Sequence, residues 1–128
     1  MRTSNVSIVE QAYDALRRRD VAAAFALFAP DVELYQSEEI PWGGSYKGHE
    51  EAAVFFGKLI QTITSTVTLE RCIDAGDHVV ALGRTRGTVN DGGQSFDVPI
   101  AHVWTLRDGL VVRVRFYIDN PTMRAALP

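Results

Sequence analysis

Residues 64–118 read TSTVTLERCIDAGDHVVALGRTRGTVNDGGQSFDVPIAHVWTLRDGLVVRVRFYI, and they hold the clearest structural pattern in this chain of 128 residues. β-Branched and aromatic residues alternate with polar ones, as in strands that bury one face. Turn-forming residues interrupt the pattern at Asp74-Ala75-Gly76-Asp77, Asn90-Asp91-Gly92-Gly93 and Arg107-Asp108-Gly109. The segment therefore predicts four strands joined by tight turns.

The residues that precede this segment predict helices. Apolar side chains recur at helical spacing over residues 5–19, and Ser4 or Ser7 can cap the first turn. Asp20 can cap a second helix over Val21–Phe28, which Pro30 helps to end. The same spacing predicts a third helix, from Ala52, Phe55, Phe56, Leu59 and Ile63.

Between the second and third helices the pattern is less regular. Residues 31–36 predict a short strand. Residues 37–48 contain Pro41 and several glycines, so we expect a loop, of the kind that often covers a site. The loop aromatics Trp42 and Tyr46 can either close the mouth of a pocket or pin the loop to the domain.

Helices followed by hairpin-linked strands predict a segregated α+β fold, with helices packed across a curved, mainly antiparallel sheet that encloses a small apolar pocket. The chain has 46% hydrophobic and 23% charged residues, as globular proteins do. Neither repeats nor a linker-like tract divides the sequence. We therefore expect residues 1–128 to form a single domain.

Charge and composition argue against several partners. The net charge is −3, and the run Arg17-Arg18-Arg19 fits the C-terminal end of a helix better than a nucleic-acid surface. The chain has no apolar run long enough for a membrane span and no signal-peptide pattern at Met1, and its one cysteine is Cys72. These features predict a cytoplasmic protein that binds neither nucleic acid nor membrane.

Motifs for metals and cofactors are also missing from the sequence. His49, His78, His102 and Cys72 have no metal-ligand spacing. The glycines do not join a strand to a helix, as a phosphate-binding loop requires, and no Gly-x-Ser-x-Gly elbow is present. We therefore expect no metal and no cofactor.

The strand around residues 96–106 has two unlike faces. One carries bulky side chains, namely Phe96, Val98, Ile100, His102 and Trp104, and the other carries Asp97, Pro99, Ala101, Val103 and Thr105. We predict that the small-residue face leaves room for the cavity and that the bulky face meets a second subunit in a homodimer. The alternative is ordinary core on one face and solvent on the other. On the first interpretation, His102 lies at the interface or on the sheet surface, opposite the pocket.

Several motifs together resemble one family. They are Ala12-Tyr13-Asp14-Ala15-Leu16, Leu27-Phe28-Ala29-Pro30-Asp31-Val32, Tyr46-Lys47-Gly48 before a Phe-rich helix, and His102–Val112 followed by Phe116–Asp119. Over nearly its whole length the chain resembles the nuclear transport factor 2-like superfamily, in its SnoaL-like branch. The resemblance implies a cystatin-like cone of N-terminal helices on a curved mixed sheet, with a pocket inside and a dimer through the outer sheet face.

The superfamily includes isomerases, cyclases, epoxide hydrolases, dehydratases and domains that only bind, so the fold does not settle the activity. Ketosteroid isomerases need a carboxylate base, a tyrosine and a protonated carboxylic acid. Tyr13 matches the tyrosine, but Gln36 and Ala101 stand where the two carboxyl groups would be. The sequence therefore argues against ketosteroid isomerisation.

Limonene-type epoxide hydrolases use an Asp-Arg-Asp set with a tyrosine and an asparagine. Arg84 and Asp119 match the arginine and one aspartate, and Gln36 is roughly comparable to the asparagine. Arg86 and Leu34 replace the other aspartate and the tyrosine. The water-activating set is broken, and this mechanism is not expected.

Asp119 matches the acid/base aspartate of SnoaL-like polyketide cyclases, which makes Asp119 and Arg84 the candidate catalytic pair. The alternative is a structural ion pair, or a turn carboxylate before Asn120-Pro121. Strand alternation places Asp119 on the opposite face from Phe116 and Ile118. If those apolar residues point inward, Asp119 reaches the pocket only through a bulge.

We expect the pocket to be lined by Tyr13, Gln36, Trp42, Phe56, Leu59 and Val103. Tyr13 is interpreted first as a core tyrosine with a satisfied hydroxyl and second as a catalytic donor. The sequence thus predicts a protein that binds a small apolar molecule. It would be either a cofactor-independent isomerase, cyclase or hydrolase, or a non-catalytic binding or accessory protein. A protein-interaction module is a third reading.

Overall fold

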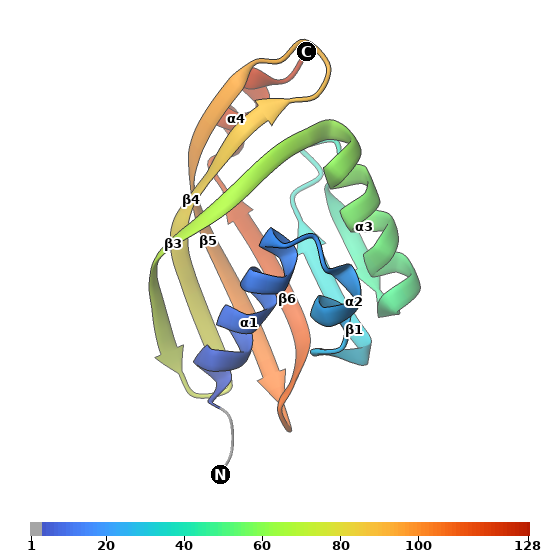
Figure 1. Cartoon of the computed structure of the whole chain (residues 1–128), viewed down its shortest axis with the longest axis vertical. Coiled ribbons are helices and arrows are strands. Elements are labelled where there is room, and N and C mark those ends of the chain that lie inside the picture. Colours follow the sequence, from blue (N-terminus) through green and yellow to red (C-terminus); the bar gives the residue numbers. More distant parts are fainter. Residues whose placement is uncertain (1–3) are drawn as a thin grey trace.

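The computed structural model describes residues 4–128 of the chain. The described residues form four helices and six strands. Two strands lie between the second and third helices, and a short helix ends the chain (Figure 1). In chain order they are α1 (Asn5–Arg17), α2 (Val21–Phe25), β1 (Phe28–Gln36), β2 (Gly44–Lys47), α3 (Gly48–Thr62), β3 (Ile63–Ala75), β4 (His78–Val89), β5 (Ser95–Arg107), β6 (Leu110–Ile118) and α4 (Asn120–Ala126).

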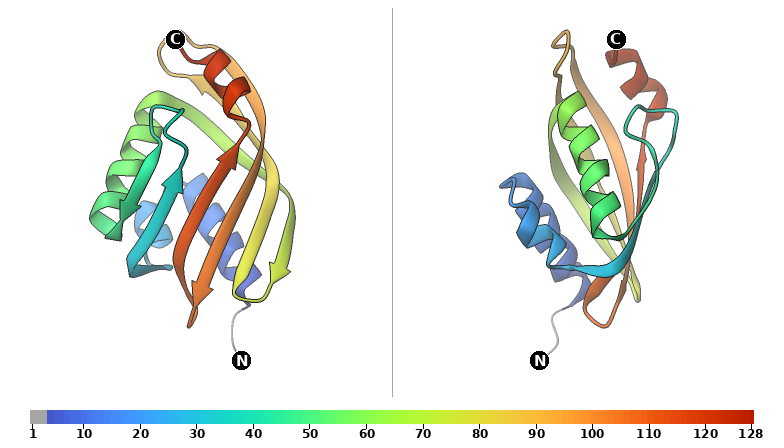
Figure 2. Two further views of the ribbon diagram at one scale, coloured as in Figure 1. Left: turned by 180° about the vertical axis from the view of Figure 1, so that it is seen from behind. Right: turned by 90° about the vertical axis from the view of Figure 1, so that its right-hand side faces the viewer.

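The six strands form one mixed sheet in the order β2-β1-β6-β5-β4-β3. The pair β1·β6 is parallel and the other pairs are antiparallel. The sheet is open, and α1, α2 and α3 cover one of its faces (Figure 2). This confirms the predicted α+β cone of helices on a curved, mainly antiparallel sheet.

The first and third helices and the four C-terminal strands lie where the sequence predicts them. Ser4 caps α1 by accepting a hydrogen bond from the Ser7 amide at 3.1 Å. Asp20 caps α2 in the same way, through Ala23. However, α2 ends at Phe25 instead of Phe28, because Phe28 already belongs to β1.

Two elements were not predicted. Strand β2 lies inside the expected loop over residues 37–48, where it pairs with β1, and its four residues, which include a glycine, are too few to show an alternating pattern. Helix α4 begins at Asn120, which we had interpreted as part of a turn. Asp119 caps it and Pro121 occupies its first turn, a position that proline tolerates well.

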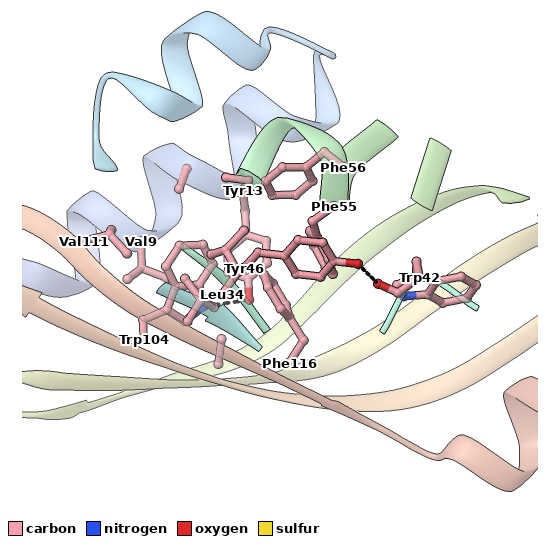
Figure 3. Close-up of a cluster of buried hydrophobic side chains, with 14 of the residues drawn as sticks. Val9, Tyr13, Leu34, Trp42, Tyr46, Phe55, Phe56, Trp104, Val111 and Phe116 are labelled. Atoms are coloured by element: carbon pink, nitrogen blue, oxygen red, sulfur yellow. Dashed lines mark hydrogen bonds between the residues drawn. The ribbon is translucent and has the colours of Figure 1, made fainter. Parts of the chain in front are cut away.

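The prediction for the two faces of β5 was wrong. Its bulky residues point toward the helices, as the buried Phe96, His102 and Trp104 show, and the small residues lie on the outer face. The physical reason is volume, because large side chains are needed to fill the space between a curved sheet and helices that span it. Figure 3 shows this aromatic core, with side chains from α1, α3, β5 and β6.

No helix in the described part of the chain is both long and apolar enough to cross a membrane.

Candidate functional site

A cavity of about 250 Å³ lies between the helices and the inner face of the sheet. Its apolar walls come from Leu16, Val21, Trp42, Phe55, Phe56, Leu59, Ile60, Ile63, Val67, Ile100, Phe116, Ile118 and Met123. Polar groups reach it from Tyr13, Arg17, Arg19, Gln36, Ser65, Thr66, Thr85 and His102. An apolar pocket with a few polar groups is typical of sites for small molecules.

Tyr13 and His102 form a buried pair in this cavity. The Tyr13 hydroxyl lies 2.6 Å from His102 Nδ1 and accepts a hydrogen bond from Trp104 Nε1 at 2.9 Å. The indole can only donate, and Nδ1 is the one acceptor that the hydroxyl proton of Tyr13 finds within residues 4–128. We therefore assign the proton of the neutral imidazole to Nε2.

Burial sets the charge state of both residues. It lowers the pKa of His102 from 6.5 to about 3, and it raises the pKa of Tyr13 above its ordinary value of 10.0. Both side chains are therefore neutral near pH 7. A neutral imidazole with its proton on Nε2 is a hydrogen-bond donor and a weak base, so His102 suits holding an oxygen atom better than removing a proton.

Gln36 provides a second donor. It is 5% exposed, and its Oε1 accepts a hydrogen bond from Trp42 Nε1 at 2.9 Å. Because the indole can only donate, this bond identifies the oxygen of the Gln36 amide and leaves its NH₂ group for other partners. The cavity thus has amide and imidazole N–H donors set in apolar walls.

The mouth of the cavity carries two positive charges. Arg17, at the end of α1, and Arg19, in the turn before α2, line the cavity and are exposed to solvent. Val21 and Ile60 are the exposed apolar residues beside them. Neither aspartate nor glutamate is among the described residues that line the cavity.

Five of the six predicted lining residues lie in the cavity wall, namely Tyr13, Gln36, Trp42, Phe56 and Leu59. Val103 does not, because it belongs to the outer face of β5. Trp42 is buried in the wall at 1% exposure. Tyr46 donates to the Trp42 carbonyl oxygen at 3.1 Å (Figure 3), so Tyr46 pins the loop instead of closing a mouth.

The structure does not bring Arg84 and Asp119 together as a pair. Arg84 Nε donates to Asp97 Oδ1 at 2.6 Å on the outer face of the sheet. Asp119 Oδ1 and Oδ2 accept from the amide and hydroxyl of Thr122 at 3.1 Å and 2.8 Å, which is a helix cap. Neither residue lines the cavity, because Phe116 and Ile118 point inward and no bulge redirects Asp119.

Sequence reasoning missed His102 and the two arginines as cavity residues. His102 follows from strand alternation once the bulky face of β5 is taken as the inner one. Arg17 comes four residues after Tyr13 in the same helix, and that spacing places both on one face. The arginine run was interpreted as positive charge that stabilises a helix C-terminus, so its position beside the cavity was not predicted.

Within residues 4–128, no three His, Cys, Asp or Glu side chains come close enough together to hold a metal ion.

The sequence matches the family described as "SnoaL-like domain" over residues 9–114. An uncharacterised protein of Mycobacterium tuberculosis is 28% identical over 120 residues, which cover 91% of this chain and 90% of that protein. Its function is not described, so this relative adds no activity.

Solved structures share the fold. A nuclear transport factor 2-like protein of Burkholderia thailandensis is 34% identical, with a TM-score of 0.90 and 98% of each chain covered. TerC, co-crystallised with polyporic acid, is 24% identical, with a TM-score of 0.88 over 95% of this chain and 96% of TerC. The likeness to TerC concerns the fold alone.

Proposed function

The chain belongs to the SnoaL-like domain family, and on that premise we propose that it binds a small apolar molecule with an oxygen acceptor inside its cavity. His102 Nε2–H would donate to that oxygen, while Phe55, Phe56 and Phe116 would contact the rings of the ligand. The observation that carries the proposal is the 2.6 Å contact between Tyr13 and His102, because it engages Nδ1 and leaves Nε2 of this cavity-lining residue to carry the imidazole proton.

Binding without proton transfer is the function that the geometry favours. A general base needs a pKa near the working pH. The pKa of His102 is lowered to about 3, and no Asp or Glu is among the described lining residues. The candidates Asp119 and Arg84 would have to act from outside the cavity wall.

A second candidate is a cofactor-independent isomerase or cyclase. Donors that are already oriented can stabilise negative charge developing on a carbonyl oxygen, and a neutral histidine can serve as such a donor. The Tyr13–His102 pair supports this reading, since the tyrosine holds the imidazole in one tautomer. The base for such a reaction would have to come from the substrate or from water.

One pair of probes tests both candidates. The ketone 1-tetralone and the hydrocarbon tetralin have the same two rings, and only the ketone can accept a hydrogen bond. Titrations followed by tryptophan fluorescence should show tighter binding of the ketone by about fivefold, as one hydrogen bond predicts. His102→Phe, which keeps an aromatic ring and removes the donor, should abolish that preference.

The same ketone separates a binder from an enzyme. Exchange of its α-protons in D₂O, followed by NMR, should not accelerate in the presence of the protein. Accelerated exchange would instead establish the enzymatic candidate. Equal affinity for ketone and hydrocarbon, or a preference that survives His102→Phe, would overturn the proposed role of His102.

We further propose that two chains associate through the outer sheet face. Tyr35 and Tyr117, on the adjacent strands β1 and β6, are 39% and 43% exposed there, and tyrosine is a residue type enriched at protein interfaces. Light scattering should give a dimer mass for the wild type and a monomer mass for Tyr117→Glu. A monomeric wild type at micromolar concentration would refute this assembly.

A further inference from the structure

The cavity has an asymmetric distribution of charge. Although the whole chain has a net charge of −3, the charged side chains among the described lining residues are Arg17 and Arg19, and both are positive. They lie at the exposed mouth, whereas the neutral donors of His102 and Gln36 are buried. A ligand in this cavity therefore meets uncharged hydrogen-bond donors inside and positive charge at the opening.

The two arginines are only weakly neutralised by neighbouring acids. Arg17 lies 4.0 Å from Asp14, and Asp14 is already bound by Arg18 at 3.0 Å. No ion pair of Arg19 is found with any residue in the range 4–128. Both guanidinium groups can therefore interact with a bound anion.

The backbone places Arg19 where an arginine is not the expected residue. Its φ is 60°, in the left-handed region that suits glycine and costs other residues about 1–2 kcal/mol. Hydrogen bonds from the Arg19 amide to the Leu16 carbonyl and from the Asp20 amide to the Ala15 carbonyl hold this turn. The turn thus fixes the main chain of Arg19 beside the mouth.

Volume limits the size of the ligand. A cavity of about 150 Å³ suffices for benzene, and drug-sized ligands occupy roughly 300–1,000 Å³. The 250 Å³ observed here lies between the two, so it suits one or two rings and not a four-ring skeleton.

From these observations, and resting on the proposed function, we infer that the cavity selects an apolar acid of one or two rings, whose carboxylate or acidic phenolate lies between Arg17 and Arg19. The rings would extend inward along the phenylalanines. Guanidinium groups suit both kinds of anion, because they present several N–H donors in a fixed plane.

The experiment compares 2-naphthoate with 2-acetylnaphthalene, which has the same rings and no charge. Calorimetric titration at low salt should show that the wild type binds the acid about tenfold more tightly than the ketone. The double variant Arg17→Gln/Arg19→Gln should lose this preference and keep its affinity for the ketone within about twofold. Raising the NaCl concentration to 500 mM should weaken the binding of the acid and leave the binding of the ketone unchanged, since salt screens exposed charges.

Arg18→Gln is the matched control. It removes one positive charge at the same helix end, but Arg18 does not line the cavity. Most of the preference for the acid should therefore persist, although Asp14 is then free to pair with Arg17. If Arg18→Gln lowers the preference for the acid as much as the double variant does, the preference depends on the overall charge at the helix end and not on Arg17 and Arg19 in the cavity. That result would overturn the inference.

The remaining outcomes separate the two proposals. If the ketone binds and the acid binds no better, the anionic ligand is refuted while the proposed function stands. If neither compound binds at millimolar concentration, the proposed function fails and the inference fails with it.

Discussion

Replacing Tyr13 by phenylalanine removes a single oxygen atom from the centre of the molecule. That oxygen accepts a hydrogen bond from Trp104 Nε1 and lies 2.6 Å from His102 Nδ1. Trp104 is 0% exposed and His102 is 6% exposed. Two buried polar groups therefore lose their partner when the hydroxyl is deleted.

The expected loss of stability follows from this count. Leaving a buried donor or acceptor unsatisfied costs about 1–3 kcal/mol, so two such groups predict a loss of about 2–6 kcal/mol. The lower half of that range is the better estimate, because His102 borders a cavity that can admit water. A loss of about 3 kcal/mol is a large fraction of the stability of an ordinary domain.

Equilibrium unfolding in urea measures this loss. With a slope of about 2 kcal/mol per molar urea, the midpoint of Tyr13→Phe should fall by about 1.5 M. Tyr35→Phe is the control, since Tyr35 is 39% exposed on the outer sheet face, and it should change stability by no more than about 0.5 kcal/mol. If the two variants unfold at the same midpoint, the hydroxyl of Tyr13 does not join two buried groups and the assigned tautomer of His102 loses its basis.

Three further predictions concern other parts of the structure. Because the pKa of His102 is about 3 in the folded state against 6.5 unfolded, only the unfolded state takes up its proton between these values. The free energy of unfolding should therefore decrease as the pH is lowered below 6.5, by up to about 1.4 kcal/mol per pH unit. His102→Gln should remove that slope in urea titrations between pH 6.5 and 4.5. Gly83→Ala should destabilise by more than about 2 kcal/mol, since the new methyl group would overlap the main chain of β3, whereas Gly57→Ala, with open space around it in α3, should stabilise by up to about 1 kcal/mol in thermal unfolding. Asp119→Ala should lower the free energy of unfolding by about 1 kcal/mol, because α4 loses its cap. The affinity for 1-tetralone should stay within about threefold in fluorescence titrations. A complete loss of binding or of any turnover would instead show that Asp119 acts in the site.

Much of the fold could be predicted from the sequence because its signals are local. The apolar spacing in α1 and α3 and the turn residues between β3, β4, β5 and β6 depend on neighbours a few positions apart. The parallel pair β1·β6 depends on partners far away in the chain. Strand β2 pairs with the nearby β1, but its four residues were too few to show an alternating pattern, and for that reason it was not anticipated.

The candidate site was predictable only in part. Tyr13 and Gln36 were expected in the cavity wall and lie there, because helix and strand alternation points them inward. Arg84 was expected opposite Asp119, yet its nearest acid is Asp97, a neighbour across the β4·β5 ladder on the same face. Choosing between two possible ion-pair partners requires the register of the strands, which no local pattern contains.

The amino-acid sequence alone determined the class of fold, the order of the main elements and the family, since periodicity, caps and turn chemistry act over short distances along the chain. Only the tertiary structure decided which face of β5 is the inner one, and with it the pairing of Tyr13 with His102 across 89 positions. It also decided that Arg17 and Arg19 border the cavity. The physical reason is that alternation divides the residues of a strand into two sets, and only packing against the helices determines which set is buried.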